Sequence, residues 1–175
     1  MNRRISRRSL LVFALLAASL SSCAGTPAAF ANGATFVVVR HAEKTNDGSK
    51  DPALTPAGQT RAQNLATSLH EVPLKAIYAT AYQRTQMTAA PSAQAHGLPV
   101  TTYDAKQPAA ELAAQLRHEY RNGTVLIVGH SNTAPEIAAA LCNCTVAPMG
   151  ENEYDRRLAI RIDANGDATL HEDHY

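Results

Sequence analysis

Short apolar strands alternate with helices along this chain, and this alternation limits the folds that it can adopt. The strongest strand signal is 124–128, an unbroken run of β-branched and aliphatic residues typical of a strand buried on both faces. A helical pattern at 133–141 follows it directly. Such units pair into an open, mainly parallel sheet with helices on both faces, and 175 residues suit one domain of this kind.

The same alternation predicts the remaining elements. Strands are expected at 35–39, 76–79 and, more weakly, 99–102, and helices from Thr55-Pro56 onward, from Thr80 toward Ala95 and at 109–121. Pro91 predicts a kink or break in the second helix. Near the end, 158–162 and 168–171 flank a turn at 164–167, which predicts a hairpin. The predicted fold class is therefore α/β, a three-layer sandwich with a mainly parallel central sheet, helices on both faces and a C-terminal β-hairpin at the edge.

Residues 1–33 have the pattern of an export signal followed by a tether. Arginines at positions 3, 4, 7 and 8 precede an apolar run at 10–20, which is too short to span a bilayer. Cys23 ends a Leu-Ser-Ser-Cys sequence that resembles a lipobox, whereas Ala29-Phe30-Ala31 fits ordinary signal cleavage, so a lipidated and a soluble mature form both stay open. The arginines also resemble a twin-arginine leader, which leaves the export route open. We expect a signal peptide and tether at 1–33, a domain at 34–175, and a periplasmic or envelope-anchored location.

Charge and cysteine content exclude several classes of partner and site. Sixteen basic and fifteen acidic residues give +1, but without the four leader arginines twelve basic residues face fifteen acidic ones, a balance of −3. A slightly acidic domain with few aromatics has no footprint for nucleic acid, so an anionic ligand needs a local cluster of cations. Cys142 and Cys144 lack further Cys or His at zinc-ligand spacing, so we predict two thiols or one small-ring disulfide in a surface loop.

Candidate site residues follow three of the predicted strands. Arg40 and His41 end the first strand, Arg84 follows the second, and His130 comes directly after the strongest one. The carboxyl ends of parallel strands meet at one edge of the sheet, so these side chains are expected to converge. This set suits phosphoryl transfer, because an arginine fork binds two phosphate oxygens and a neutral imidazole can attack phosphorus.

Three sequence blocks resemble the histidine phosphatase superfamily and its phosphoglycerate mutase-like fold. They are Arg40-His41 with Leu54-Thr55-Pro56-Ala57-Gly58 downstream, 82–89 (YQRTQMTA) and 128–133 (VGHSNT), in the family's order. Together with the leader, they identify the chain as similar to small exported bacterial members. The resemblance implies that His41 takes the phosphoryl group. It also implies that the other residues, Arg40, Arg84 and His130, form the phosphate pocket, with no metal and no organic cofactor.

The chain departs from the family at the acid that protonates the leaving oxygen. Many members carry Asp directly after the second histidine, where this chain has Ser131-Asn132. Glu111 in the middle segment is the candidate acid, although a solvated helix carboxylate describes it equally well. Without such an acid, good leaving groups such as phosphohistidine or aryl phosphates are favoured. The long insertion of the phosphoglycerate mutases is missing, which argues against mutase activity.

The resulting prediction is a metal-independent histidine acid-type phosphatase that hydrolyses phosphomonoesters through a phosphohistidine on His41. Its expected substrate is a phosphorylated small molecule or, because of the export signal, an envelope glycolipid phosphate. Membrane attachment is expected only through a lipidated Cys23. Two alternatives stay open. One is a metal-dependent hydrolase with His41, Glu43 and His130 as ligands, which the neighbouring arginines disfavour, and the other is a non-catalytic phosphate-binding module.

Overall fold

The structure is a computed structural model that describes residues 33–175. The predicted leader, with Cys23, lies outside the described residues. Six strands form one sheet in the order β3-β2-β4-β1-β5-β6. The elements are, in chain order, β1 (Gly33–Arg40), α1 (Pro56–Ser68), β2 (Leu74–Thr80), α2 (Gln83–His96), β3 (Val100–Tyr103), α3 (Ala109–Glu119), β4 (Gly123–Gly129), α4 (Thr133–Cys142), β5 (Arg156–Asp163) and β6 (Ala168–His174).

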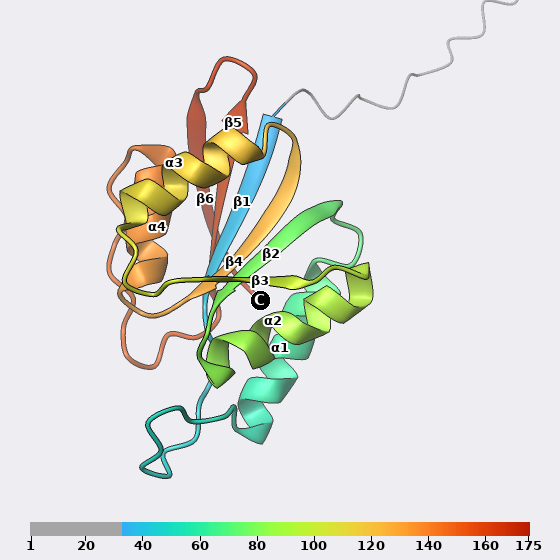
Figure 1. Ribbon diagram of the computed structural model, residues 1–175, viewed down its shortest axis with the longest axis vertical. Coiled ribbons are helices and arrows are strands. Elements are labelled where there is room, and N and C mark those ends of the chain that lie inside the picture. Colours follow the sequence, from blue (N-terminus) through green and yellow to red (C-terminus); the bar gives the residue numbers. More distant parts are fainter. Residues whose placement is uncertain (1–32) are drawn as a thin grey trace, which may run out of the picture.

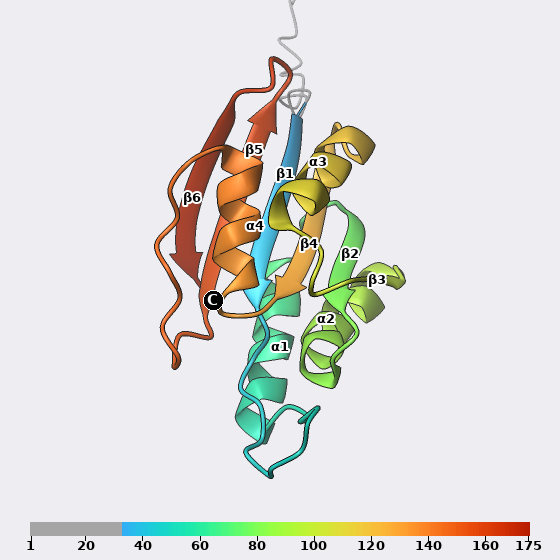
Figure 2. The ribbon, with the colours of Figure 1, turned by 60° about the vertical axis from the view of Figure 1, so that its left-hand side comes forward.

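The sheet is mixed, with a helical layer on each face (Figures 1 and 2). Strands β1 to β4 pair in parallel, whereas β5 runs antiparallel to β1 and pairs with β6 in a hairpin. Side chains of β1 alternate between the faces: Phe36 and Val38 pack toward α3 and α4, and Val37 and Val39 toward α1 and α2. This arrangement confirms the predicted sandwich, because a strand buried on both faces needs apolar residues at every position.

Two expectations about α2 were wrong. Thr80 is the last residue of β2, and Tyr82 precedes the helix without a side-chain capping bond. Pro91 lies inside a helix that continues from Gln83 to His96. Proline removes a single backbone donor from the helix. Packing of Ala89 and Ala93 in the core holds the helix against the sheet on both sides of that position.

The start of α1 packs directly against the segment that follows β1. Thr55 caps the helix, its hydroxyl oxygen accepting from the Gly58 backbone N–H at 3.0 Å, and Pro56 occupies the first turn, as predicted. The Thr55 N–H also donates to the Glu43 carbonyl at 2.9 Å. A Cβ at Gly58 would lie 2.2 Å from that same carbonyl oxygen, so only glycine permits this approach. Helix α1 thereby fixes the backbone two residues beyond His41.

Gly58→Ala is therefore expected to destabilise the protein by about 1–3 kcal/mol, because the added methyl forces α1 away from the Glu43 backbone. Urea denaturation measures the loss. Gln59→Ala, at an exposed position of the same helix, serves as the control without a clash. Equal stability of the two variants would show that α1 does not need this close approach.

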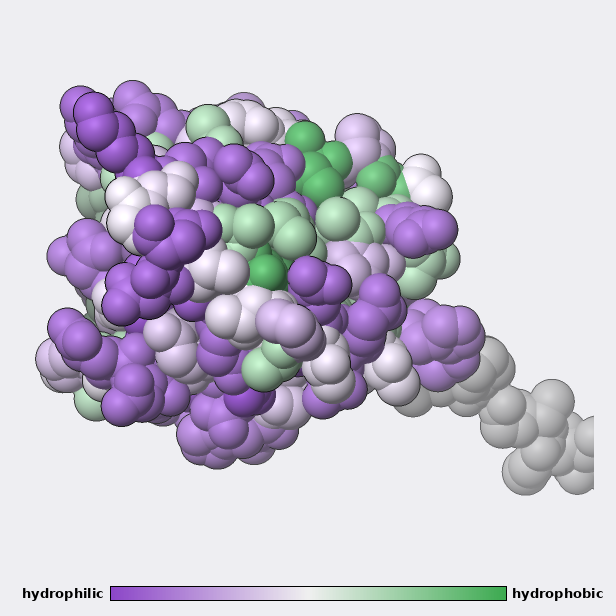
Figure 3. All heavy atoms as spheres, turned by 90° about the horizontal axis from the view of Figure 1, so that it is seen from below, coloured by the Kyte–Doolittle hydropathy of each residue, from purple (hydrophilic) through white to green (hydrophobic). Residues whose placement is uncertain are grey.

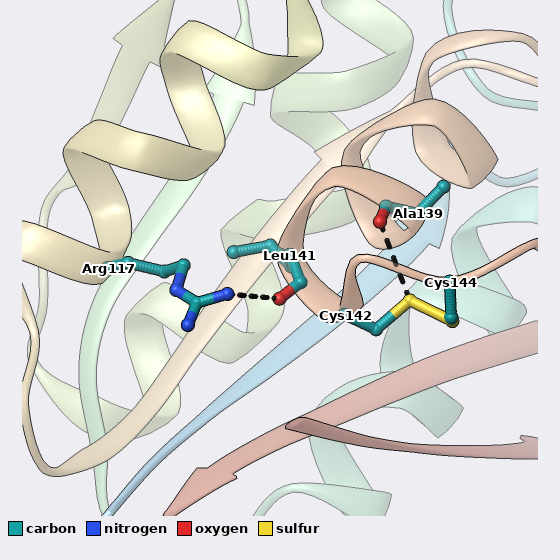
Figure 4. Close-up of a disulfide and its surroundings, with 5 residues drawn as sticks. All are labelled: Arg117, Ala139, Leu141, Cys142 and Cys144. Carbon is teal, nitrogen blue, oxygen red and sulfur yellow. Dashed lines mark hydrogen bonds between the residues drawn. A yellow bond between two sulfur atoms is a disulfide. The ribbon is translucent and has the colours of Figure 1, made fainter. Parts of the chain in front are cut away.

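A disulfide joins Cys142 and Cys144 where α4 ends (Figure 4). Asn143 between them has a positive φ of 51°, and the Cys144 N–H donates to the Ala139 carbonyl. Beside it, Arg117 of α3 donates to the Leu141 carbonyl at 3.0 Å and ties the ends of the two helices together. No helix among residues 33–175 has the length and apolar character needed to cross a membrane.

Candidate active site

The structure brings Arg40, His41, Arg84 and His130, here called the anion pocket, to one end of the sheet. His41 follows β1, and its N–H donates to the Gly129 carbonyl of β4 at 2.9 Å. The ring centroids of His41 and His130 are 5.5 Å apart, and the two imidazoles meet edge to face. An Arg84 Nη atom lies 3.5 Å from Nδ1 of His130. Figure 3 views this end of the molecule, where hydrophilic residues surround a smaller apolar group.

His41 is held in one orientation by its backbone and by α2. Its side chain is buried, and its Nδ1–H donates to the Ala42 carbonyl at 2.8 Å. Because the carbonyl can only accept, the proton resides on Nδ1 and the lone pair on Nε2. The Ala42 N–H in turn donates to the Thr88 hydroxyl at 3.0 Å, and that hydroxyl donates to the Arg84 carbonyl at 2.7 Å. Thr88 thus connects the nucleophile candidate to the helix that carries Arg84.

Both imidazoles are neutral near pH 7. Burial lowers the pKa of His41 to about 3, and Arg84, His130 and Arg40 add to the effect. Burial also lowers the pKa of His130 to about 4, again with contributions from both arginines. Arginine is only a donor, so Nδ1 of His130 faces Arg84 as an acceptor, and its Nε2–H donates to the Thr80 hydroxyl at 3.1 Å. The site therefore combines a neutral potential nucleophile with fixed positive charge.

Arg40 is anchored to the segment that precedes β5. Its guanidinium donates through Nη1 to the carbonyls of Gly150 and Glu151, both at 2.8 Å. The Tyr154 ring stacks on the same guanidinium, with 4.2 Å from Cζ to the ring centroid, and lies 6.2 Å from the His41 ring. These contacts hold the arginine in place, and none of them uses its Nε–H group.

Arg84 is held by a second tyrosine and by Asp51. Its Cζ lies 4.3 Å from the centroid of the Tyr82 ring, and its Nη1 lies 3.6 Å from an Asp51 carboxylate oxygen. The same oxygen accepts from the Gln83 backbone N–H at 2.9 Å, so Asp51 caps α2 from a distant loop. Both arginines are fixed by partners that leave part of each fork unused.

The unused atoms are the Nε–H groups of Arg40 and Arg84. Each is buried and has no hydrogen-bond partner among the described residues. A buried donor without a partner is costly, and two of them in one cationic pocket indicate an anionic ligand. Phosphate oxygens match the planar donor geometry of guanidinium. The arrangement can therefore hold a phosphoryl group beside Nε2 of His41.

Because His41 has a lowered pKa, kcat/KM is expected to stay level from pH 7 down to about pH 5 after correction for substrate ionisation. The neutral imidazole of His41 is the form that can attack phosphorus. A lowered pKa keeps the ring neutral at lower pH, so activity should persist there. The measurement is a pH profile of kcat/KM with two substrates that differ in phosphate pKa. A limb at about 6.5, the ordinary imidazole value, in both profiles would contradict it.

Carboxylates around the pocket are engaged elsewhere. Glu43 forms a forked ion pair with Arg61, with bonds of 2.7 to 3.0 Å. Glu111, the acid suggested by sequence, is exposed in the first turn of α3 and has no hydrogen bond or ion pair to the pocket within residues 33–175. The described residues contain no group of three metal-ligating side chains, so His41, Glu43 and His130 do not form the alternative metal site.

Sequence analysis missed four residues that shape the pocket: Asp51, Tyr82, Thr88 and Tyr154. Tyr82 and Thr88 lie within the 82–89 block, so the sequence indicated this segment but not the contacts that the two residues make. Tyr154 lies near the end of the chain, outside the three sequence blocks. Asp51 carried no signal, because a lone aspartate in a polar loop is common.

A family model described as the histidine phosphatase superfamily (branch 1) matches residues 36–107, which include Arg40, His41 and Arg84. This match supports the histidine phosphatase superfamily for the segment that carries β1 to β3. The observed fold and the residues at the carboxyl ends of β1, β2 and β4 agree with that family. A search of curated proteins found no match.

Solved structures share the fold at low sequence identity. The protein histidine phosphatase SixA in complex with tungstate is 19% identical, with a TM-score of 0.64, covering 80% of this chain and 96% of SixA. Mycobacterial glucosyl-3-phosphoglycerate phosphatase is 17% identical, with a TM-score of 0.63 and coverages of 82% and 99%. Phosphoserine phosphatase from Entamoeba histolytica, in complex with 3-phosphoglyceric acid, is 15% identical, with a TM-score of 0.60 and coverages of 81% and 97%.

Proposed function

We propose that this protein is a histidine phosphatase that hydrolyses phosphomonoesters through a covalent phosphohistidine on His41. The observation that carries the proposal is the orientation of His41. Its Nδ1–H is committed to the Ala42 carbonyl, which leaves Nε2 as the nucleophilic atom in a pocket with two unpartnered arginine donors. The family-model match to residues 36–107 and the phosphatases among the similar structures support the same reaction class.

The reaction follows from these positions. Nε2 of His41 attacks phosphorus, forming an N–P bond while the bond to the leaving oxygen breaks, and that oxygen departs as an anion that takes its proton from solvent. Arg40 and Arg84 neutralise the charge on the phosphoryl oxygens during transfer. Water then attacks the phosphohistidine, which releases inorganic phosphate and restores the imidazole. As proposed, this sequence of steps requires no metal.

The two carboxylates described beside the anion pocket already have partners. Glu43 is paired with Arg61, and Asp51 is engaged by Arg84 and by the Gln83 backbone. The hydrogen bonds from Arg61 lower the pKa of Glu43, which favours its ionised form, and an ionised carboxylate cannot donate a proton. We therefore infer that substrates have leaving groups of low pKa, such as aryl oxides or the imidazole of phosphohistidine.

The place of action is a second part of the proposal. The basic and apolar start of the chain supports export, with the protein periplasmic or held at the envelope through a lipidated Cys23. A phosphorylated small molecule or an envelope glycolipid phosphate is then the substrate class.

Hydrolysis of an aryl phosphate, with and without a chelator, tests the reaction. We expect chelator-resistant turnover, together with a protein-bound label from ³²P-substrate that survives alkaline but not acid quenching. Loss of activity with chelator would favour the metal-dependent alternative. Absence of turnover with intact phosphate binding would favour the non-catalytic binding module.

A further inference from the structure

We propose that a cavity beside Tyr82 is the leaving-group subsite and that it accepts a planar aromatic leaving group. This inference rests on the proposed function, since a leaving group presupposes phosphoryl transfer. The cavity, here called the Tyr82 cavity, has a volume of about 410 Å³, within the range of small-molecule sites. It is lined by Ala81, Tyr82, Thr102, Tyr103, Asp104, Ala105 and Lys106.

The order of the strands places this cavity at the β2 and β3 side of the sheet end, away from His41 after β1. Along the end of the sheet the strands follow as β1, β4, β2 and β3, with Arg40 level with Gly129 and Thr80 level with Tyr103. Neighbouring strands lie about 4.8 Å apart, so this end of β3 is roughly 14 Å from β1. His41 attacks from the β1 side, and attacking and leaving atoms lie roughly opposite each other. The leaving oxygen therefore points toward the ends of β2 and β3.

Tyr82 connects the anion pocket to the cavity. Its ring stacks on Arg84 and meets the His130 ring edge-on at 5.3 Å, and it also lines the cavity. It is the exposed large hydrophobic side chain within residues 33–175, with 40% of its surface accessible. A phosphoryl group held by Arg84 and His130 consequently has an aromatic ring beside its leaving atom.

The chemistry of the lining favours an aromatic occupant. Ala81 and Ala105 present only methyl groups, and Tyr103 is buried with its hydroxyl donating to the Val128 carbonyl at 3.3 Å. Asp104 and Lys106 are the charged residues of the lining, one of each sign, so they add no net charge that would select an ionic group. Aromatic rings gain from stacking in addition to the apolar area that they bury. An aryl leaving group also matches the inferred preference for leaving groups of low pKa.

Calorimetric titration with inorganic phosphate, methylphosphonate and phenylphosphonate tests the subsite without turnover, because a C–P bond is not hydrolysed. Phenylphosphonate is expected to bind about tenfold more tightly than methylphosphonate. Ala105→Leu fills the cavity and is expected to abolish this preference while inorganic phosphate binding holds. Ala164→Leu is the matched control, since Ala164 lines a different cavity, together with Phe36 of β1.

Tyr82→Ala provides a second variant. Because Tyr82 also stacks on Arg84, the affinity for inorganic phosphate is measured in the same variant to detect any effect on that arginine. The preference for phenylphosphonate is expected to fall in this variant by more than the affinity for phosphate. Equal affinity of the two phosphonates in the wild type, or a preference that persists in Ala105→Leu, would overturn the subsite. Phenylphosphonate preference without hydrolysis of any aryl phosphate would refute the proposed function and show that the Tyr82 cavity is an aromatic binding site, not a leaving-group subsite. Failure of all three anions to bind would refute both.

Discussion

His41→Ala is expected to lower kcat by at least about 10³-fold, because the variant has no atom that can accept the phosphoryl group. The stability of the fold should change little, since the core strands β1 and β4 pair through their backbones. Turnover of an aryl phosphate and urea denaturation measure the two effects. In the wild type, the trapped phosphoryl group is expected on Nε2, because Nδ1 is bonded to the Ala42 carbonyl.

His70→Ala is the matched control, because His70 has an exposed side chain outside the anion pocket. It should retain wild-type turnover. Turnover that survives in His41→Ala would exclude a phosphohistidine on this residue. Phosphate attached to Nδ1 would contradict the orientation described for the ring.

Arg84→Gln is expected to reduce kcat/KM by about 10²–10³-fold, the usual loss when one donor to the transition state is removed. Glutamine keeps a polar side chain but lacks the charged fork. Inhibition by inorganic phosphate should weaken in parallel, because the same donors hold the product. Arg84→Lys should recover only part of the loss, since an ammonium group cannot bind two oxygens side by side.

Arg121→Gln is the control for a lost surface charge, because Arg121 lies with Phe36 and Ile162 in a separate cavity. Asp51→Asn asks whether the orientation of Arg84 matters. The amide oxygen can still accept from the Gln83 N–H, but the ion pair is lost, so KM should rise more than kcat falls. Unchanged phosphate inhibition in Arg84→Gln would remove this arginine from the anion pocket.

The parts of the fold that sequence predicted are those with strong local signals. Strands β1 and β4 are apolar at nearly every position because both faces are buried, and that pattern is visible without the structure. The residues at their carboxyl ends could be selected because parallel strands end at the same edge. Thr55 and Pro56 marked the start of α1 for a similar reason.

The contacts that complete the pocket could not be read in this way. Arg40 donates to the carbonyl of Gly150, which lies 110 residues further along the chain in a segment without regular structure. Asp51 reaches Gln83 across 32 residues. Such contacts depend on the path of a loop in three dimensions, and no periodicity in sequence encodes that path. Glu111 shows the opposite error, because an acidic residue in the expected segment faces solvent in α3.

The two ends of β1 have different neighbours, and this determines which way the anion pocket of a tethered protein would face. The strand starts at Gly33, the first described residue, and ends at Arg40, directly before His41; Figure 2 shows the direction of β1 through the domain. Its eight residues span roughly 25 Å. A domain held to a bilayer through Cys23 would thus carry its anion pocket on the side remote from the lipid. If the protein is exported as proposed, that orientation would expose the pocket to phosphates diffusing in the periplasm, and headgroups of the anchoring leaflet would be reached only if the domain rotated.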